Sequence, residues 1–188
     1  MDLTPRAYHR TPEMHLREGS LVTDWGRHNI GYLKDITPYG ATFQPLDLKG
    51  YQKEKALQYV LLRDAYERLY RYESNLHEAN VQWREHLNTC YDEFVMRYGN
   101  LNAKQNVKLV MMDAGGRDIL SLERVKNGKF VKADIFERPV SFAVESHANV
   151  GSPEEALSAS LNKFGTVDLD YMREITDSTA EELLTALQ

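Results

Sequence analysis

The chain has 188 residues, 42% apolar and 27% charged, which is ordinary for a globular protein with a core of its own. It contains no run of eighteen apolar residues and no apolar signal-peptide segment at its start, so the sequence predicts a cytoplasmic protein without a membrane span. Cys90 is the single cysteine, which excludes an internal disulfide and a cysteine-rich zinc site.

The net charge of −5 is unevenly distributed along the chain. Residues 99–134 carry seven bases and four acids, whereas residues 135–188 carry three bases and ten acids. The middle of the chain should therefore attract a phosphate backbone weakly, and the acidic end should repel one. The whole chain does not have the charge of a strongly basic nucleic-acid binder.

Residues 1–50 are predicted to form an N-terminal arm followed by a small β-unit. The stretch "SLVTDWGRHNIGYLKDI" contains two β-prone runs, and "GATFQPL" contains a third. Pro38, Gly40 and Pro45 separate these runs as turn residues do.

Residues 51–150 are predicted to combine an antiparallel helical hairpin with a β-hairpin. Between residues 53 and 74 the four-residue spacing of apolar side chains predicts one buried helical stripe, made of Leu57, Leu61, Ala65 and Leu69. A second helix ends at a Gly99 cap and carries apolar residues at helical spacing, namely Leu87, Cys90, Tyr91, Phe94, Val95 and Tyr98. Residues 75–80 form the short link between the two helices.

Residues 106–136 are predicted to return to β structure. Asn127-Gly128 is typical of a two-residue type I′ hairpin turn. Counting outward from this turn predicts the pairs Val125–Phe130, Glu123–Lys132, Leu122–Ala133 and Leu120–Ile135.

Residues 151–188 are predicted to form an acidic tail of three short helices. Ser152 and Ser178 each begin a capping box, and a third helix starts near Asp168. This outline resembles a helix-turn-helix, but the negative charge favours docking to a protein over reading DNA. The fold class predicted for the whole chain is therefore α+β.

Gly115-Gly116 follows an apolar stretch, as glycines do in phosphate-binding loops. A P-loop would continue with Lys-Ser/Thr, but Arg117-Asp118 follows here, and Asp118 would repel a phosphate. A dinucleotide loop would need three spaced glycines opening a helix. We therefore expect a turn that tolerates a positive φ and leads into a strand.

No residue is nominated as catalytic, cofactor-binding or metal-ligating. The histidines lack HExxH spacing, and the carboxylates are scattered. Cys90 is expected to be a buried, inert thiol without a neighbouring base. The aromatic residues of the two long helices favour interhelical packing over a base-stacking platform. The charged residues of the first helix are expected to form solvated ion pairs: Arg63, Arg68 and Arg71 with Asp64, Glu67 and Glu73.

The best local candidate for DNA contact is the β-hairpin. A basic β-ribbon can follow a phosphate backbone or enter a groove. The candidate side chains are Arg117, Arg124, Lys126, Lys129 and Lys132. The alternative, which is the commoner role, is that lysines at a strand edge only protect it from aggregation.

Five stretches resemble a region of very large bacterial polypeptides that combine an adenine-specific DNA methyltransferase with a Swi/Snf-like superfamily-two helicase. These are "YDEFVMRYGNLNAKQNV", "DILSLE", "KADIFERPV", "SPEEALSASLNKFGTVDLDYMREIT" and "STAEELLTAL". The resemblance covers roughly residues 57–187, and such polypeptides occur on conjugative elements, plasmids and phages.

The resemblance implies a context and not an activity. The methyltransferase Asp/Asn-Pro-Pro-aromatic motif, its glycine loop and the helicase Walker motifs have no counterpart here. We therefore expect a non-catalytic segment, such as an excised domain or truncated homologue, that positions DNA or couples flanking methyltransferase and helicase modules. The alternative is a protein-interaction scaffold without DNA contact, for element maintenance or antirestriction.

Overall fold

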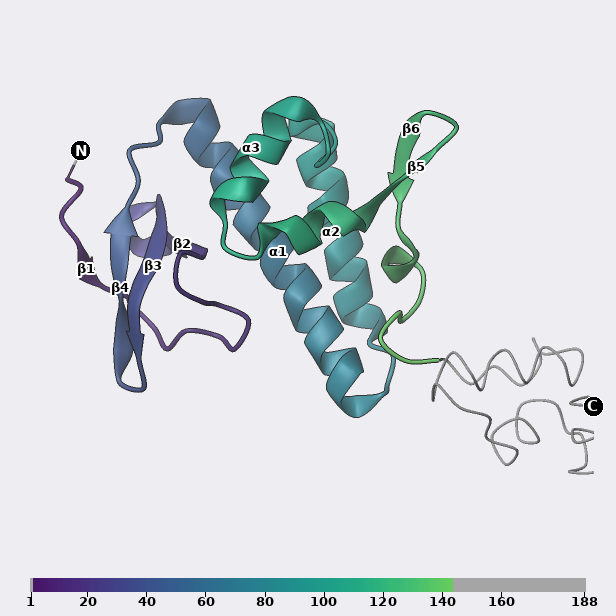
Figure 1. Ribbon diagram of the computed structural model, residues 1–188, viewed down its shortest axis with the longest axis horizontal. Helices are drawn as coiled ribbons and strands as arrows, with labels where there is room; N and C mark the ends of the chain where they lie inside the picture. The colour runs from purple at the N-terminus through teal and green to yellow at the C-terminus, as the bar shows by residue number, and fades with distance from the viewer. Residues whose placement is uncertain (1, 144–188) are drawn as a thin grey trace, which may run out of the picture. The chain divides into compact units, whose positions relative to one another are not determined.

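The computed structural model describes residues 2–143 (Figure 1), and these residues belong to two compact units. The first unit comprises residues 2–71 and 80–137. The described part of the second comprises residues 72–79 and 138–143, in which the rings of His77 and Phe142 stack with centroids 5.4 Å apart. The acidic helical tail expected over 151–188 lies outside the described residues.

The predicted N-terminal β-unit is confirmed as a four-stranded antiparallel sheet with strand order β1-β4-β3-β2. Its elements are β1 (Arg6–Ala7), β2 (Leu21–Asp24), the 3-10 helix η1 (Trp25–Arg27), β3 (Asn29–Thr37) and β4 (Gly40–Pro45). Successive side chains of a strand point to opposite faces of the sheet, and here apolar side chains on both faces are buried. Leu21 and Ile30 join the main core, while Val22 and Leu33 pack with Tyr8 in a smaller one.

The predicted helical hairpin is also confirmed. It consists of α1 (Gly50–Leu76) and α2 (Val81–Tyr98), joined by four residues. Asn80 begins α2 by accepting a hydrogen bond from the Trp83 amide, and Gly99 follows it with a φ of 84°. The prediction for the α1 stripe was wrong at Leu61, which is 39% exposed, whereas its neighbour Leu62 is fully buried.

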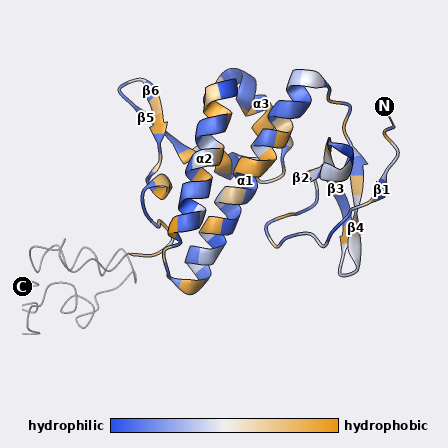
Figure 2. Cartoon of the chain, turned by 180° about the vertical axis from the view of Figure 1, so that it is seen from behind, coloured by the Kyte–Doolittle hydropathy of each residue, from blue (hydrophilic) through white to orange (hydrophobic). Residues whose placement is uncertain are grey.

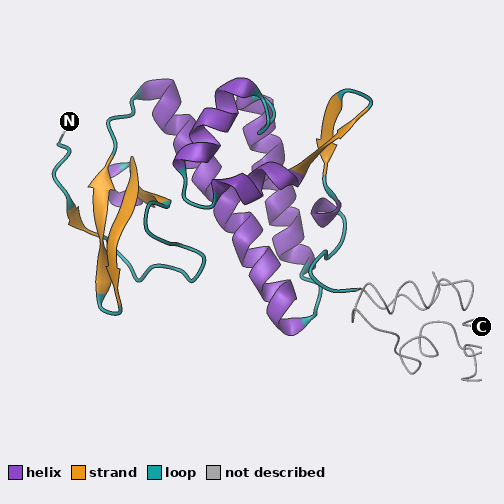
Figure 3. Ribbon diagram, in the orientation of Figure 1, coloured by secondary structure: helices purple, strands orange, loops and turns teal. Residues whose placement is uncertain are grey.

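The segment before the β-hairpin is helical, and the prediction that it forms a strand was wrong. Residues expected to form a strand instead form α3 (Lys104–Met112), and the glycine pair leads into the 3-10 helix η2 (Gly116–Leu122) rather than a strand (Figure 3). A short apolar run such as "VKLVMM" does not distinguish a strand from a buried helix. Asn106 stabilises the start of α3 by donating hydrogen bonds to the carbonyls of Tyr98, Gly99 and Asn100.

The β-hairpin consists of β5 (Glu123–Lys126) and β6 (Lys129–Lys132), followed by the 3-10 helix η3 (Asp134–Phe136). Its predicted register is confirmed for the pairs Val125–Phe130 and Glu123–Lys132. The turn residues Asn127 and Gly128 have φ values of 53° and 74°, as a type I′ turn requires.

The prediction was wrong beyond the base of the hairpin. Leu122 and Ala133 still share a backbone hydrogen bond of 2.9 Å, but Leu120 belongs to η2 and does not pair with Ile135 as a strand residue. None of the helices described is long and apolar enough to cross a membrane.

Candidate nucleic-acid interface

The two lysines next to the hairpin turn are exposed members of the predicted DNA-binding set. Lys126 and Lys129 lie opposite each other at the last pair before the turn, and both are exposed. Figure 1 shows the turn at the end of the hairpin that points away from the helices of the same unit. Neither ammonium has a hydrogen bond or ion pair to any residue in 2–143. Both charges are therefore available to an anionic partner.

Arg124 and Lys132 are held by other side chains. Arg124 forms an ion pair of 2.7 Å with Asp134. Lys132 lies 2.9 Å from an Asp92 carboxylate oxygen and donates a hydrogen bond of 2.8 Å to Asn88 on α2. The Lys132 ammonium also lies over the Tyr91 ring, 5.6 Å from its centroid. Lys132 thus fastens the hairpin to α2.

Arg117 does not belong to the hairpin. It is exposed in η2, two residues after Gly115, while the other four candidates lie on β5 and β6. The structure therefore gathers four of the five predicted cations on one ribbon, and leaves two of those four without a partner among the residues described.

The base of the hairpin is anchored by the buried carboxylate of Glu123. One carboxylate oxygen accepts hydrogen bonds from the Tyr91 hydroxyl (2.7 Å), the Asn100 amide (2.8 Å) and the Leu101 backbone (3.1 Å). The other accepts from the backbone and side chain of Asn102. Burial alone would raise the pKa of Glu123, but the hydrogen bonds outweigh it and hold that pKa below its usual value.

The hairpin also carries an exposed apolar pair that sequence reasoning did not consider. Val125 and Phe130 lie opposite each other and are 69% and 40% exposed. Figure 2 shows hydrophobic colour on the hairpin next to its hydrophilic turn. The predicted register already placed these two residues on one face, so the sequence contained the signal.

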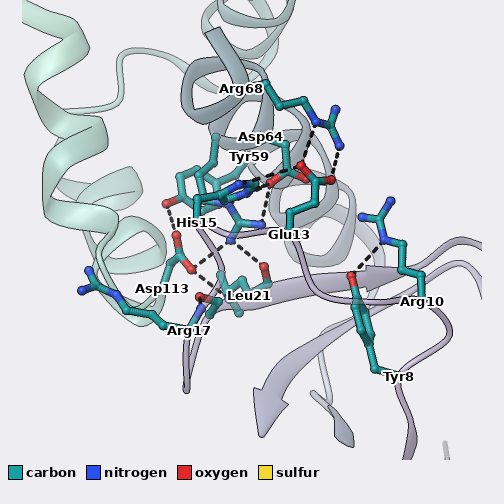
Figure 4. Close-up of polar contacts among 12 residues, drawn as sticks. Tyr8, Arg10, Glu13, His15, Arg17, Leu21, Tyr59, Asp64, Arg68 and Asp113 are labelled. Atoms are coloured by element: carbon teal, nitrogen blue, oxygen red, sulfur yellow. Dashed lines mark hydrogen bonds and ion pairs between the residues drawn. The ribbon is translucent and has the colours of Figure 1, made fainter. Parts of the chain in front are cut away.

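A second polar cluster, buried in the first unit, joins the N-terminal segment to α1 and to the residue after α3 (Figure 4). At its centre, Arg63 donates hydrogen bonds to Asp64 (2.9 Å) and Asp113 (3.0 Å). The Tyr59 hydroxyl donates to Asp113 at 2.7 Å, and His15 contacts Asp64 at 2.9 Å.

The prediction that Arg63 and Asp64 form a solvent-exposed ion pair on α1 was wrong, because both side chains are buried in this cluster. Arg63 and Asp64 are only 4% and 6% exposed. Burial raises the pKa of the Asp64 carboxyl, but the His15 contact and the Arg63 charge outweigh burial and lower it overall. Arg68 also pairs with Glu13 of the N-terminal segment, not with a neighbour on its own helix. The cluster is a satisfied structural network, because each of its charges has a partner inside it.

The glycine pair is a structural turn next to this cluster, as expected. Gly115 has a φ of 83°, and a Cβ there would lie 2.0 Å from the Arg17 guanidinium. A Cβ on Gly116 would lie 2.0 Å from the Val110 carbonyl oxygen and 3.1 Å from the Tyr59 hydroxyl. The close approach of η2 to α3 and α1 therefore requires glycine.

Cys90 is buried on α2, as expected, but a base does lie beside it. The His86 ring nitrogen is 3.6 Å from its sulfur, one helical turn away. Burial and the nearby Glu93 carboxylate raise the pKa of the thiol, so the pair does not produce a reactive thiolate. Within residues 2–143, no three His, Cys, Asp or Glu side chains are grouped so that they could hold a metal ion.

The fold and site define an α+β chain with a basic, firmly anchored β-hairpin. Among known families, residues 149–188 match a family model described as "Probable helicase, winged helix domain". This match associates the C-terminal part of the chain with helicases. No curated protein and no solved structure matches the chain.

Proposed function

We propose that this chain is a non-catalytic accessory module of a helicase-related polypeptide, and that it contacts DNA through the tip of the β5–β6 hairpin. The observation that carries the proposal is the pair of exposed ammonium groups, Lys126 and Lys129, on a ribbon whose base is fixed by Glu123 and Lys132. Anchoring of the base fixes the backbone positions from which the two lysines extend, so less backbone ordering is needed when they contact phosphates.

The helicase-related match over 149–188 supports this role. More specifically, we propose that the chain belongs to a DNA methylase/helicase polypeptide of a mobile element such as a conjugative plasmid or phage. In that polypeptide it would couple the methyltransferase and helicase modules and position their DNA. The sequence resemblance over residues 57–187 supports this more specific assignment to a methylase/helicase polypeptide.

The alternative is a protein-interaction scaffold for element maintenance or antirestriction that does not contact DNA. Residues 149–188 contain eight acids and two bases, and this excess of negative charge repels a phosphate backbone. The acidic region would then bind a basic partner protein, and the hairpin lysines would only keep the ribbon edge from aggregating.

The two functions are separated by fluorescence anisotropy of labelled single-stranded and duplex DNA, titrated with the full chain at several salt concentrations. Contacts of Lys126 and Lys129 to two phosphates predict a log–log slope of roughly −1.4 to −1.8, which any further phosphate contact would steepen. Absence of binding to both DNAs at low salt would contradict DNA contact and leave the scaffold function.

A further inference from the structure

The two faces of the hairpin carry different chemistry. Successive side chains of a strand point to opposite faces, so the Val125–Phe130 pair lies on one face and the adjacent Lys126–Lys129 pair on the other. Arg124 shares the lysine face. The tip of the ribbon therefore presents cations on one side and exposed apolar surface on the other.

The apolar pair lies between the anchored base and the lysine-bearing tip. On its own face, the next pair toward the base is Glu123–Lys132, whose side chains contact α2. Contacts to α2 fix this end of the face, and Phe130, the next residue toward the turn on that face, is 40% exposed. Burying an exposed ring and a valine in a complex would be favourable.

A cation and an exposed aromatic ring are both accessible from one edge of the hairpin, the outer edge of β6. The hairpin is a two-stranded sheet, so the outer edge of β6 is unpaired among the residues described. Lys129 and Phe130 are neighbours on that edge and point to opposite faces. A partner that runs along β6 can therefore meet a cation and an aromatic ring within a single residue step.

The partner that fits this edge is anionic and offers flat apolar faces at short intervals. Single-stranded DNA has both properties, because its phosphates are charged and its unpaired bases can stack on aromatic side chains. In a duplex the base faces are already stacked on one another. We propose that the hairpin binds a single-stranded segment, with Lys126 and Lys129 at its phosphates and Phe130 stacked on an unpaired base. This inference rests on the proposed DNA contact and specifies its substrate class.

The test compares two labelled strands of equal length by anisotropy: a thymidine oligonucleotide and an abasic strand that keeps the phosphates but has no bases. The full chain should bind the thymidine strand about tenfold more tightly, which corresponds to roughly one stacked base. Phe130→Ala should abolish this preference without changing the salt slope, whereas Lys126→Ala/Lys129→Ala should flatten the slope on both strands and keep the preference.

Two further variants serve as controls. Tyr39→Ala removes an aromatic side chain that is 98% exposed at the turn between β3 and β4, and should leave the preference unchanged. Phe130→Leu keeps an apolar side chain without the ring, so it should lose most of the preference while its circular dichroism and thermal midpoint match those of the parent.

Three results would overturn the inference in distinguishable ways. Equal affinity for the two strands, or a preference that survives Phe130→Ala, would exclude base stacking but leave backbone contact standing. Binding to polyglutamate with the same affinity and salt slope would show a general anion site and not a nucleic-acid one. Failure to bind either strand or a duplex at low salt would exclude the proposed DNA contact as well.

Discussion

The Arg63 guanidinium on α1 donates a 3.0 Å hydrogen bond to Asp113, fifty residues further along the chain and directly after α3. Asp113 also accepts hydrogen bonds from the Tyr59 hydroxyl and, at 2.8 Å, from the backbone of Leu21 at the start of β2. One buried carboxylate thus connects the sheet, α1 and the end of α3. The hydrogen bonds of Asp113 therefore hold β2 of the N-terminal sheet against α1 and the end of α3.

We predict that Asp113→Ala destabilises the chain by on the order of 3 kcal/mol, because it leaves part of the buried Arg63 charge and two donors without an acceptor. Urea unfolding followed by circular dichroism measures this change. Asp47→Ala, which removes an exposed carboxylate 3.7 Å from Lys49, is the control and should change stability by less than about 0.5 kcal/mol. Equal effects of the two substitutions would refute the structural role of Asp113.

Gly116→Ala should cost about 1–3 kcal/mol, because the new methyl group would overlap the Val110 carbonyl oxygen and force η2 away from α3. Gly26→Ala is the matched control, since a Cβ there has its nearest neighbour, an Asp24 oxygen, at an ordinary 3.5 Å. The thermal midpoints of the two variants give the comparison. A midpoint for Gly116→Ala equal to that of the parent would show that η2 does not approach α3 as closely as described.

The Glu123 carboxylate should make the chain sensitive to acid. Its pKa is lower in the folded chain than the usual value of 4.5, so its contribution to stability is present above that pH and is lost as the pH falls through the lower, folded value. Glu123→Gln should destabilise the chain at pH 7 by about 1.5–3 kcal/mol, since charge-assisted hydrogen bonds are lost.

Unfolding curves from pH 7 to pH 3 check the Glu123 prediction. The difference in stability between the parent and Glu123→Gln should narrow as the pH falls below about 4.5, because the unfolded parent takes up a proton there while the folded parent, with its lower pKa, still excludes it. A difference that stays constant over this range would mean that the carboxylate is not held in its charged form.

Cys90 should react slowly with a thiol reagent at pH 8 in the native chain and rapidly in denaturant. It is 5% exposed, and burial raises the pKa of its thiol. The control is Thr89→Cys/Cys90→Ser, which moves the thiol to an exposed neighbouring position and should react rapidly in the native state. Rapid native labelling of Cys90 would instead indicate that His86 activates it.

Local chemistry explains which elements could be predicted from the sequence. Asn127-Gly128 specifies a tight hairpin turn by itself, so both the turn and the register of the adjacent pairs were correct. Leu87 and Phe94 mark one face of α2 by their spacing, and both are fully buried. In each case the decisive interactions lie within a few residues along the chain.

The burial of Arg63 and the helical structure of α3 were predicted wrongly, because both depend on hydrogen bonds to residues outside their own local sequence pattern. Arg63 was assigned to solvent because charged residues on an amphipathic helix usually face water. Its burial depends on Asp113 and on the Leu21 carbonyl, which the helical pattern does not reveal. The α3 segment was assigned to a strand because a short apolar run fits either structure, and the Asn106 amide that stabilises its start acts through backbone carbonyls before the helix.

The central claim is that Lys126 and Lys129 contact the DNA backbone, and the most direct test is the salt dependence of binding for matched double variants. Lys126→Ala/Lys129→Ala is compared with Lys104→Ala/Lys108→Ala, which removes the same charge from exposed positions of α3. Each phosphate contact contributes roughly one unit to the slope of log affinity against log salt. We predict that the hairpin variant flattens the slope by about 2 while the α3 variant leaves it unchanged. Equal slopes for the parent and the hairpin variant would contradict the account.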